Sequence, residues 1–315
     1  MKRKFLVLIF LILILKLSVN ANFLWTRFID NTALNINDAV FLGQRGWFCA
    51  DNGVIKTTND SGITWTNQNT GINLNIKKIA VNNNASIVSV LCDTQTIIIS
   101  LDGGVTWINR SPTAHISSNI ILKDIAVTSN AIYAVGTNNI ILKSTNNGQT
   151  WIKQYEGILT SNFIYFFNDN NGLVIGDRHI LMTSNAGADW TLTNTPYNFK
   201  KVYCYNNYLW FAVTDDNKLY QTIEGPTRWA FLYAFNFNVN SLYFSSYNNG
   251  WAVGDNGNIY FTAPNPANWQ KLDIPNYPHT FDFNKIFMYE NQDTIFIFGD
   301  NGYYFMRTFD YTQFD

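Results

Sequence analysis

Six acidic residues stand at matching places along the chain, each just after a short apolar run that ends in a turn. They are Asp51, Asp93, Asp177, Asp215, Asp255 and Asp300. Carboxylates repeated in this way could form a ring of metal ligands, or could supply a pair for general acid–base catalysis. Their shared position ahead of a turn instead favours a structural role, in which each carboxylate caps turn amides. We therefore predict no metal site from this set.

The other side chains that could do chemistry are few and scattered. The three histidines, His115, His179 and His279, fall in separate predicted loops, so no short spacing brings nitrogen ligands to one point. Three cysteines, expected to be buried and unpaired, are Cys49, Cys92 and Cys204. The chain has no phosphate-binding loop and no Ser-His-Asp order that suggests a triad. The sequence therefore predicts no cofactor and no catalytic activity.

A recurring tryptophan shows which elements must position these side chains. The series begins at Trp25 and continues, at intervals of 39 to 44 residues, through Trp65, Trp107, Trp151, Trp190, Trp229 and Trp269. A second motif recurs in the units, as in GWAVGDNGNIYFT at residues 250–262 ahead of Trp269, and it reads as strand, tight turn, strand. A period of this length is typical of units of four short strands.

From this period we predict an all-β fold, a seven-bladed β-propeller with four-stranded antiparallel blades. Residues 22–315 divide into seven units of 42 residues. In the sixth unit the strands are expected at 239–244, 250–254, 258–262 and around Trp269. The last unit lacks a Trp, so we expect its outer strand to come from the N-terminal segment around Trp25. This exchange would close the ring and remove open sheet edges.

A hairpin of the pattern Ser/Thr-x-Asp-x-Gly-x-Thr-Trp leads into each Trp from Trp65 to Trp269, as in SLDGGVTW at residues 100–107, and the copies before Trp229 and Trp269 are degenerate. Its side-chain oxygens can accept hydrogen bonds from turn amides, its Gly can adopt positive φ, and its Trp can pack between blades. We expect a structural role for the four best copies. Their residues are Asp60, Gly62 and Trp65; Asp102, Gly104 and Trp107; Asn146, Gly148 and Trp151; and Asn185, Gly187 and Trp190.

This hairpin resembles the Asp-box, or bacterial neuraminidase (BNR) repeat. With the GWAVGDNGNIYFT phrase, the chain is similar over residues 23–315 to the seven-bladed photosystem II stability and assembly factor family. The resemblance implies a non-catalytic protein that binds a membrane-protein subunit and its partners during assembly. Two features depart from the family pattern. The arginines are scattered one to a blade and not clustered, and the leader resembles a secretory signal and not a plastid transit sequence.

The Asp-box leaves open an alternative, a carbohydrate-binding or glycoside-hydrolase-like (sialidase-type) propeller. Sialidase chemistry needs three arginines that clamp the substrate carboxylate, and a Tyr nucleophile paired with an acid. The Arg-Ile-Pro signature typical of the first arginine is absent. The leading hypothesis is therefore an exported, non-catalytic propeller that serves as a protein-binding or assembly scaffold.

Binding is expected on the face that carries the crossovers from an outer strand to the next inner strand. Because strand direction alternates, the crossovers share this face with the turns between second and third strands, and the Asp-box turns lie on the other. The crossovers vary in sequence and carry aromatic residues beside polar groups, as protein-interface anchors do. The candidate partner-binding residues are Arg110, Tyr155, Arg178, Tyr197, Phe199, Tyr233, Phe237 and Tyr277.

The N-terminus predicts export. Lys2, Arg3 and Lys4 precede an eleven-residue apolar run at 5–15, so residues 1–21 read as a signal peptide and 22–315 as a single propeller domain. We expect a secreted or periplasmic, extracytoplasmic location. The net charge of -1 argues against nucleic acid as a partner. We expect a monomer that binds a protein partner, with carbohydrate as the alternative ligand.

Overall fold

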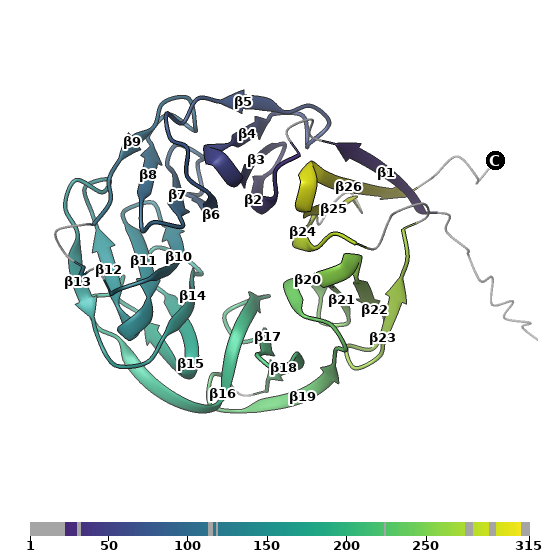
Figure 1. Ribbon diagram of the computed structural model, residues 1–315. Coiled ribbons are helices and arrows are strands. Elements are labelled where there is room, and N and C mark those ends of the chain that lie inside the picture. The colour runs from purple at the N-terminus through teal and green to yellow at the C-terminus, as the bar shows by residue number, and fades with distance from the viewer. Residues whose placement is uncertain are drawn as a thin grey trace, which may run out of the picture.

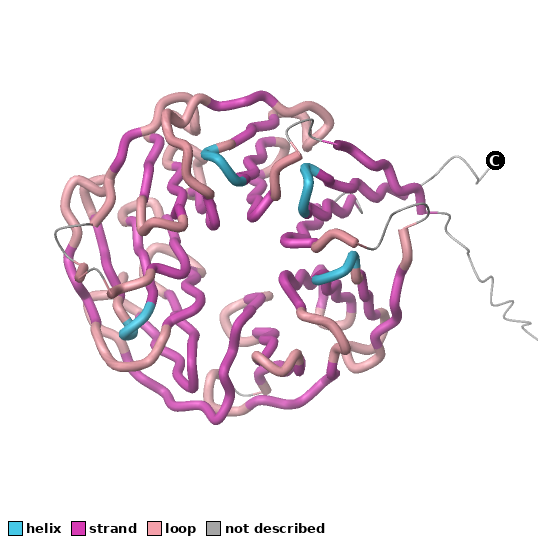
Figure 2. Tube along the Cα trace, viewed as in Figure 1, coloured by secondary structure: helices cyan, strands magenta, loops and turns pink. Residues whose placement is uncertain are grey.

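The computed structural model describes residues 23–29, 33–112, 116–117, 119–223, 225–274, 280–289 and 294–309. Its strands are arranged as a ring, and each sheet runs from the central axis to the rim (Figure 1). Strands and loops make up most of this ring (Figure 2). Short 3-10 turns follow four strands at Asp51–Gly53, Thr137–Asn139, Asp255–Gly257 and Asp300–Gly302. In the part of the chain described here, no helix is long and apolar enough to cross a membrane.

Five sheets have four strands each, paired antiparallel. The first three are β2 (Ile36–Leu42), β3 (Arg45–Ala50), β4 (Ile55–Thr58) and β5 (Thr66–Gln68); β6 (Ile76–Val81), β7 (Val88–Cys92), β8 (Ile97–Ser100) and β9 (Ile108–Asn109); and β10 (Leu122–Val127), β11 (Ile132–Gly136), β12 (Ile141–Ser144) and β13 (Ile152–Tyr155). Another is β20 (Val239–Ser246), β21 (Asn249–Gly254), β22 (Ile259–Thr262) and β23 (Trp269–Leu272). The last is β24 (Phe283–Tyr289), β25 (Thr294–Gly299), β26 (Tyr303–Phe309) and β1 (Phe23–Ile29). The prediction of an all-β propeller with four-stranded antiparallel blades is confirmed.

The number of sheets differs from the prediction. We expected seven separate blades, and the hydrogen bonds give six sheets, one of them with six strands. Its strands are β14 (Ser161–Phe166), β15 (Gly172–Thr183), β16 (Thr191–Cys204), β17 (Trp210–Thr214), β18 (Lys218–Thr222) and β19 (Trp229–Ala234). Residues of β16 up to Asn198 pair with β15, and those from Phe199 pair with β17. The crossover here is short and contains Pro196, which favours extended backbone in the residue before it, so one strand serves two sequence units.

The N-terminal strand β1 is the outer strand of the last sheet. It pairs antiparallel with β26 along its whole length, and Trp25 lies opposite Arg307. In Figure 1 these two strands, from opposite ends of the chain, lie side by side at the rim. Arg307 is 4% exposed, and its guanidinium lies 5.6 Å from the centre of the Trp25 ring and 4.9 Å from that of Trp251. Burial lowers the pKa of Arg307 to about 10. This contact ties β1 to the neighbouring sheet as well as to its own.

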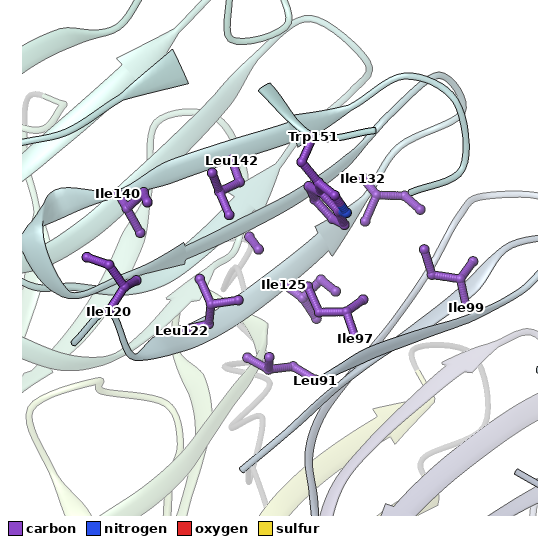
Figure 3. Packing of buried hydrophobic residues seen from close by; sticks show 11 residues of the cluster. Leu91, Ile97, Ile99, Ile120, Leu122, Ile125, Ile132, Ile140, Leu142 and Trp151 are labelled. Carbon is purple, nitrogen blue, oxygen red and sulfur yellow. The ribbon is translucent and has the colours of Figure 1, made fainter. Parts of the chain in front are cut away.

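The core lies between neighbouring sheets. In the cluster of Figure 3, Leu91, Ile97 and Ile99 of one sheet pack against Ile125 and Leu142 of the next. Trp151 lies in the same cluster and is 2% exposed, so this Trp packs between sheets as predicted. Trp65, Trp107 and Trp190 are half-buried. Because each sheet buries its apolar side chains against the next one, the ring is held together sheet by sheet.

The Asp-box turns have the predicted hydrogen bonds. In the copy at 100–107, the Gly104 amide donates to Ser100 Oγ at 2.7 Å and the Thr106 amide donates to Asp102 Oδ1 at 2.9 Å. The same pair of bonds recurs at Thr58 and Asp60, Ser144 and Asn146, and Thr183 and Asn185. Gly104 adopts a φ of +104°, which favours glycine. A hydrogen bond from Thr58 and others from Thr64 lower the pKa of Asp60 to about 2.

The two faces of the ring are also as predicted. The amides of Ser61, Gly103 and Ala186 in Asp-box turns donate to carbonyls in the turns between first and second strands. On the other face, the amides of Asp215 and Asp255 donate to the crossover carbonyls of Asn198 and Asn238. We call the surface that carries the crossovers and the turns between second and third strands the crossover face.

Candidate functional site

A β-bulge marks the start of every inner strand, by which we mean β2, β6, β10, β14, β20, β24 and the second half of β16. In each, a buried residue pairs with the second strand, the next residue is unpaired, and the third pairs again. The unpaired residues are Asn37, Lys77, Lys123, Asn162, Lys200, Asn240 and Asn284. A bulge redirects side chains and commonly lies next to a functional site. Here the bulges surround the channel on the crossover face.

The four bulge asparagines hold neighbouring inner strands together. Asn284 Nδ2 donates to Asp300 Oδ1 at 2.9 Å and to the Ile36 carbonyl of the first sheet at 3.0 Å. Asn37, Asn162 and Asn240 make the matching pair of bonds, each to an Asp of their own sheet and to a carbonyl of the next inner strand. Thus Asp51, Asp177, Asp255 and Asp300 have a structural role, but their carboxylates accept from asparagine side chains of the inner strands and not, as we predicted, from turn amides.

The residues that follow the bulges form a ring of charges inside the channel. We call this set the channel ring: Asp38, Lys78, Asp124, Phe163, Lys201, Ser241 and Lys285. Lys285 Nζ lies 2.8 Å from Asp38 Oδ1, and Lys78 Nζ lies 3.9 Å from Asp124 Oδ1. Asp38 and Asp124 also accept hydrogen bonds from the Ile79 and Ile164 amides of the next inner strands. The two acids therefore link adjacent inner strands through these hydrogen bonds and form ion pairs with two of the lysines.

Burial opposes ionisation in this ring, and the ion pairs counteract it to different degrees: at Asp124 burial prevails over Lys78 and raises the pKa. Burial alone would raise the pKa of Asp38, but Lys285 and Lys78 outweigh it and hold that pKa below its usual value. Burial would lower the pKa of Lys78, but Asp124 and Asp38 outweigh it and raise the pKa instead. For Lys201 burial prevails: together with the nearby positive charge of Lys78, it lowers the pKa to about 8.

Two adjoining cavities occupy the channel. The central cavity has a volume of about 450 Å³, and its wall includes Asp38, Lys78, Lys201 and Lys285 with the aromatic residues Phe163, Tyr165, Tyr203, Tyr243 and Phe287. The mouth cavity has a volume of about 430 Å³ and opens toward Asp177, Asp215 and Asn238 on the crossover face. Lys78, Lys200 and Lys201 line both. Cavities of this size accommodate small ligands or the side chains of a bound peptide.

Of the residues that we predicted for partner binding, those that the structure describes do not line these cavities. Phe199 is 1% and Phe237 is 7% exposed, and they pack on Trp229 and Tyr260, respectively, so their side chains are in the core. Tyr197 is half-buried with its ring 4.4 Å from that of Tyr220. The aromatic residues of the crossovers therefore mainly anchor those segments to the sheets.

The other predicted residues lie elsewhere on the ring. Arg110 lies at an outer seam, where its carbonyl accepts a hydrogen bond from Trp151 Nε1 at 2.8 Å. Tyr233 packs on Phe235, and Tyr155 packs against the core at the end of β13. Arg178 is exposed at the turn inside β15 on the crossover face. Tyr277 lies outside the described residues, as does the predicted signal peptide at 1–21.

The described residues contain no group of three or more His, Cys, Asp or Glu side chains that could hold a metal ion. His179, one of the candidates, is buried and contacts Ser161 Oγ at 3.2 Å and the Asp177 carbonyl at 3.0 Å. Burial lowers its pKa. Its contacts indicate that it supports the turn inside β15.

We did not predict the channel ring from the sequence, although a repeated sequence pattern marks its residues. Aligned at the start of each inner strand, the chain reads IND, IKK, LKD, SNF, FKK, VNS and FNK. One apolar or small residue is followed by Asn or Lys and then usually by a charged residue. A charge repeated inside otherwise apolar strands is costly to bury unless the charges meet. That pattern could have predicted a polar channel lining.

Comparisons with known proteins agree with this architecture. A family model described as "Photosynthesis system II assembly factor YCF48" matches residues 71–156. A search of curated proteins found no significant match. The solved structure described as "YCF48 bound to D1 peptide" is 16% identical, with a TM-score of 0.73 over 93% of this chain and 97% of that chain. YCF48 from Cyanidioschyzon merolae is 14% identical, with a TM-score of 0.73 over 92% and 99%.

The ring is also similar to propellers of other families. The WD40 domain of Doa1 is 6% identical, with a TM-score of 0.69 over 90% of this chain and 96% of that one. At sequence identities this low, the structural similarity shows only that the folds are alike. The sequence match and the two YCF48 structures together confirm, at the level of the family, the similarity to photosystem II assembly factors that the repeats predicted.

Proposed function

We propose that the protein is an exported, non-catalytic scaffold that binds a protein partner through its crossover face. This proposal rests on a structural difference between the two faces of the ring. One face consists of Asp-box turns whose side chains are bonded to their own backbones, whereas the channel and its lysines open on the other. The YCF48 structure with a bound D1 peptide supports a peptide segment as the class of ligand.

The proposal includes the architecture that the sequence units imply. Residues 1–21 act as a signal peptide, and residues 22–315 form one seven-unit propeller in which two units share the six-stranded sheet. The pairing of β1 with β26 supports closure of this ring by the N-terminal strand. The mature protein is a monomer in this proposal. N-terminal sequencing of the exported protein and light scattering on it would test the leader and the monomer separately.

Site-directed photo-crosslinking tests the binding face. A photoreactive phenylalanine analogue is placed at Lys123, an exposed bulge residue at the mouth cavity, and in a second variant at Arg110 on the outer seam. The matched control is Val105 in an Asp-box turn, which is 68% exposed. We expect a discrete crosslinked partner at Lys123 and none at Val105. Equal crosslinking at all three positions, or a partner only at Val105, would contradict the crossover face as the binding surface.

One observation keeps carbohydrate binding as a second candidate. On the Asp-box face, a cavity of about 430 Å³ is lined by amide side chains and by Tyr208, which is 79% exposed, as sugar-stacking residues are. Asp189 is the one carboxylate among its lining residues, and it accepts a hydrogen bond from Asn185 at 2.9 Å. Most glycosidases need two carboxylates, so this cavity favours sugar binding over hydrolysis. Glycan-array binding that is lost in Tyr208→Ala would support this candidate.

A further inference from the structure

The charges of the channel ring do not balance. Three lysines, Lys78, Lys201 and Lys285, face two acids, Asp38 and Asp124. Lys78 and Lys285 are each paired with an acid. Two bulge lysines also line the central cavity: Lys77 is paired with Asp51 at 3.2 Å, and Lys200 Nζ donates to the side-chain oxygens of Asn217 and Asn238. Within the ring itself one positive charge is in surplus, and the pairing places it on Lys201.

Lys201 stands in the neutral part of the ring. Its neighbours on the adjoining inner strands are Phe163 and Ser241, and Ser241 Oγ already accepts a hydrogen bond from the Ile286 amide. Among the described residues, no carboxylate lies within ion-pair distance of the Lys201 ammonium. Lys201 is half-buried in the wall of both cavities, and a cation with reduced access to water and no counter-ion favours a bound anion. The Lys201 side chain lines both cavities, so an anion can reach it from the crossover face.

An aromatic wall lies deeper in the channel on the same side as Lys201. Because alternate strand residues share a face, the channel positions two residues beyond the ring are Tyr165, Tyr203, Tyr243 and Phe287 on four adjoining inner strands. The Tyr203 and Tyr243 rings lie 5.1 Å apart, and those of Tyr243 and Phe287 lie 5.8 Å apart. The matching positions on the other inner strands are the smaller Val40, Ala80 and Ala126. This leaves room beside the aromatic wall for an apolar group.

We propose that the central cavity binds a small organic monoanion, a carboxylate with an aromatic or alkyl body, whose carboxylate pairs with Lys201 and whose body packs on Tyr203, Tyr243 and Phe287. The single surplus charge favours a monoanion over phosphate or a dicarboxylate. The aromatic wall favours an apolar body over a sugar acid. The site does not depend on a protein partner, so it stands or fails separately from the scaffold function.

The site should couple anion binding to proton uptake. Burial and Lys78 lower the pKa of Lys201 to about 8, and a bound carboxylate would raise it again. The other charged groups near Lys201 are Lys285, Asp38 and Asp124 around the ring, and Lys123, Lys200, Asp177 and Asp215 in the wall of the mouth cavity. Above about pH 8, where part of the Lys201 population is neutral, each binding event should therefore take up a fraction of a proton.

Calorimetric titration of the mature protein tests the proposal with phenylacetate and indole-3-acetate as probes. Their neutral amides and inorganic phosphate serve as comparison ligands. We expect the carboxylates to bind about tenfold or more tightly than the amides, because only they pair with the ammonium. Repeating the titration at about pH 8.5 in buffers of different ionisation enthalpy measures the proton uptake.

Variants assign the binding to Lys201. Lys201→Gln should weaken phenylacetate binding about tenfold or more and abolish the proton uptake, whereas Lys271→Gln on the exposed outer strand β23 should leave both unchanged. Asp38→Asn raises the surplus charge of the ring and should tighten binding. Circular dichroism and the melting temperature establish that each variant is folded.

Four outcomes would overturn the proposal. These are equal binding of phenylacetate and its amide, unchanged binding in folded Lys201→Gln, equal or tighter binding of phosphate, and absence of binding in the wild type. A short peptide that ends in Phe, with its terminus free or amidated, separates the two sources of an apolar carboxylate. Binding of the free-ended peptide but not of phenylacetate would overturn a small-molecule site and point to a protein chain end.

Discussion

Asn284 offers the sharpest test of how the ring is held together. Its side-chain amide is the donor in two hydrogen bonds, one to Asp300 of its own sheet and one to the Ile36 carbonyl of the first sheet. Asn284→Ala removes both bonds and leaves the half-buried Asp300 without this donor. Two backbone-donor bonds at the same seam remain, from the Gly302 amide to the Leu34 carbonyl and from the Asn301 amide to Asn35 Oδ1. The ring should therefore weaken at this seam and stay closed.

The expected loss of stability follows from these contacts. A neutral hydrogen bond contributes about 0.5–1.5 kcal/mol, and one to a charged acceptor about 1.5–3 kcal/mol. Because water can reach the half-buried Asp300 after the change, we expect the lower end of the sum, about 2 kcal/mol. In a protein of this size, 1 kcal/mol lowers the melting temperature by roughly 2–4 °C, so the expected fall is roughly 4–8 °C.

Differential scanning calorimetry of the mature protein measures this fall, and Asn248→Ala is the matched control because Asn248 is an exposed residue in the β20–β21 turn. Burial raises the pKa of Asp300, and the bond from Asn284 opposes that rise. A carboxyl group whose folded pKa is raised destabilises the fold above that pKa and ceases to do so when it is protonated. The deficit of Asn284→Ala should therefore shrink as the pH falls through the pKa of Asp300. A change below about 1 °C at neutral pH, or a deficit that grows in acid, would refute the reasoning.

Three further changes should have distinct effects. Asp102→Ala should lower the free energy of unfolding by about 1–2 kcal/mol, because the carboxylate accepts hydrogen bonds from Ser100, the Val105 amide and Thr106. Asp102→Asn should leave the stability nearly unchanged, since Asn occupies this position in two other copies of the turn. Thermal melts of the two variants compare these effects. Phe237→Ala should lower the free energy of unfolding by about 3–5 kcal/mol, because the phenyl ring is buried. A denaturant titration measures this loss, and it shows whether a loss of partner binding in this variant comes from unfolding. Deletion of residues 23–29 should expose the edge of β26 and cause self-association, measured by light scattering, and a fully monomeric variant with an unchanged melting temperature would contradict the role of β1.

The hairpins could be predicted from the sequence because their information is local. The strands expected at 239–244, 250–254 and 258–262 agree with β20, β21 and β22 to within a few residues. The Asp-box turns likewise depend on side chains only two to four residues from the amides that they cap. Repetition of these local signals was enough to identify a propeller.

The site depends on residues that are distant in the chain, and therefore could not be read in the same way. Lys285 and Asp38 meet only because the ring brings the last inner strand beside the first. Phe199 and Phe237 looked like exposed crossover residues, but both are buried. Strand alternation turns Phe199 of β16 inward, whereas Phe237 lies in the loop before β20 and packs on Phe235 and Tyr260. We also did not predict the six-stranded sheet. The Trp period gives the number of sequence units, but it does not show whether a strand continues from one unit into the next.

The pairing of β1 with β26 has a consequence for the order of events in the cell. A ribosome produces β1 first and its partner strand about 280 residues later, which takes roughly 15–60 s at ordinary elongation rates. Throughout that time the outer position of the last sheet does not exist, and β1 has no native strand to join. The N-terminal segment of the nascent protein must therefore be kept from pairing with other chains until synthesis ends. A protein of this topology will depend on chaperones, or on delivery across a membrane in an unfolded state, more than its short local hairpins suggest.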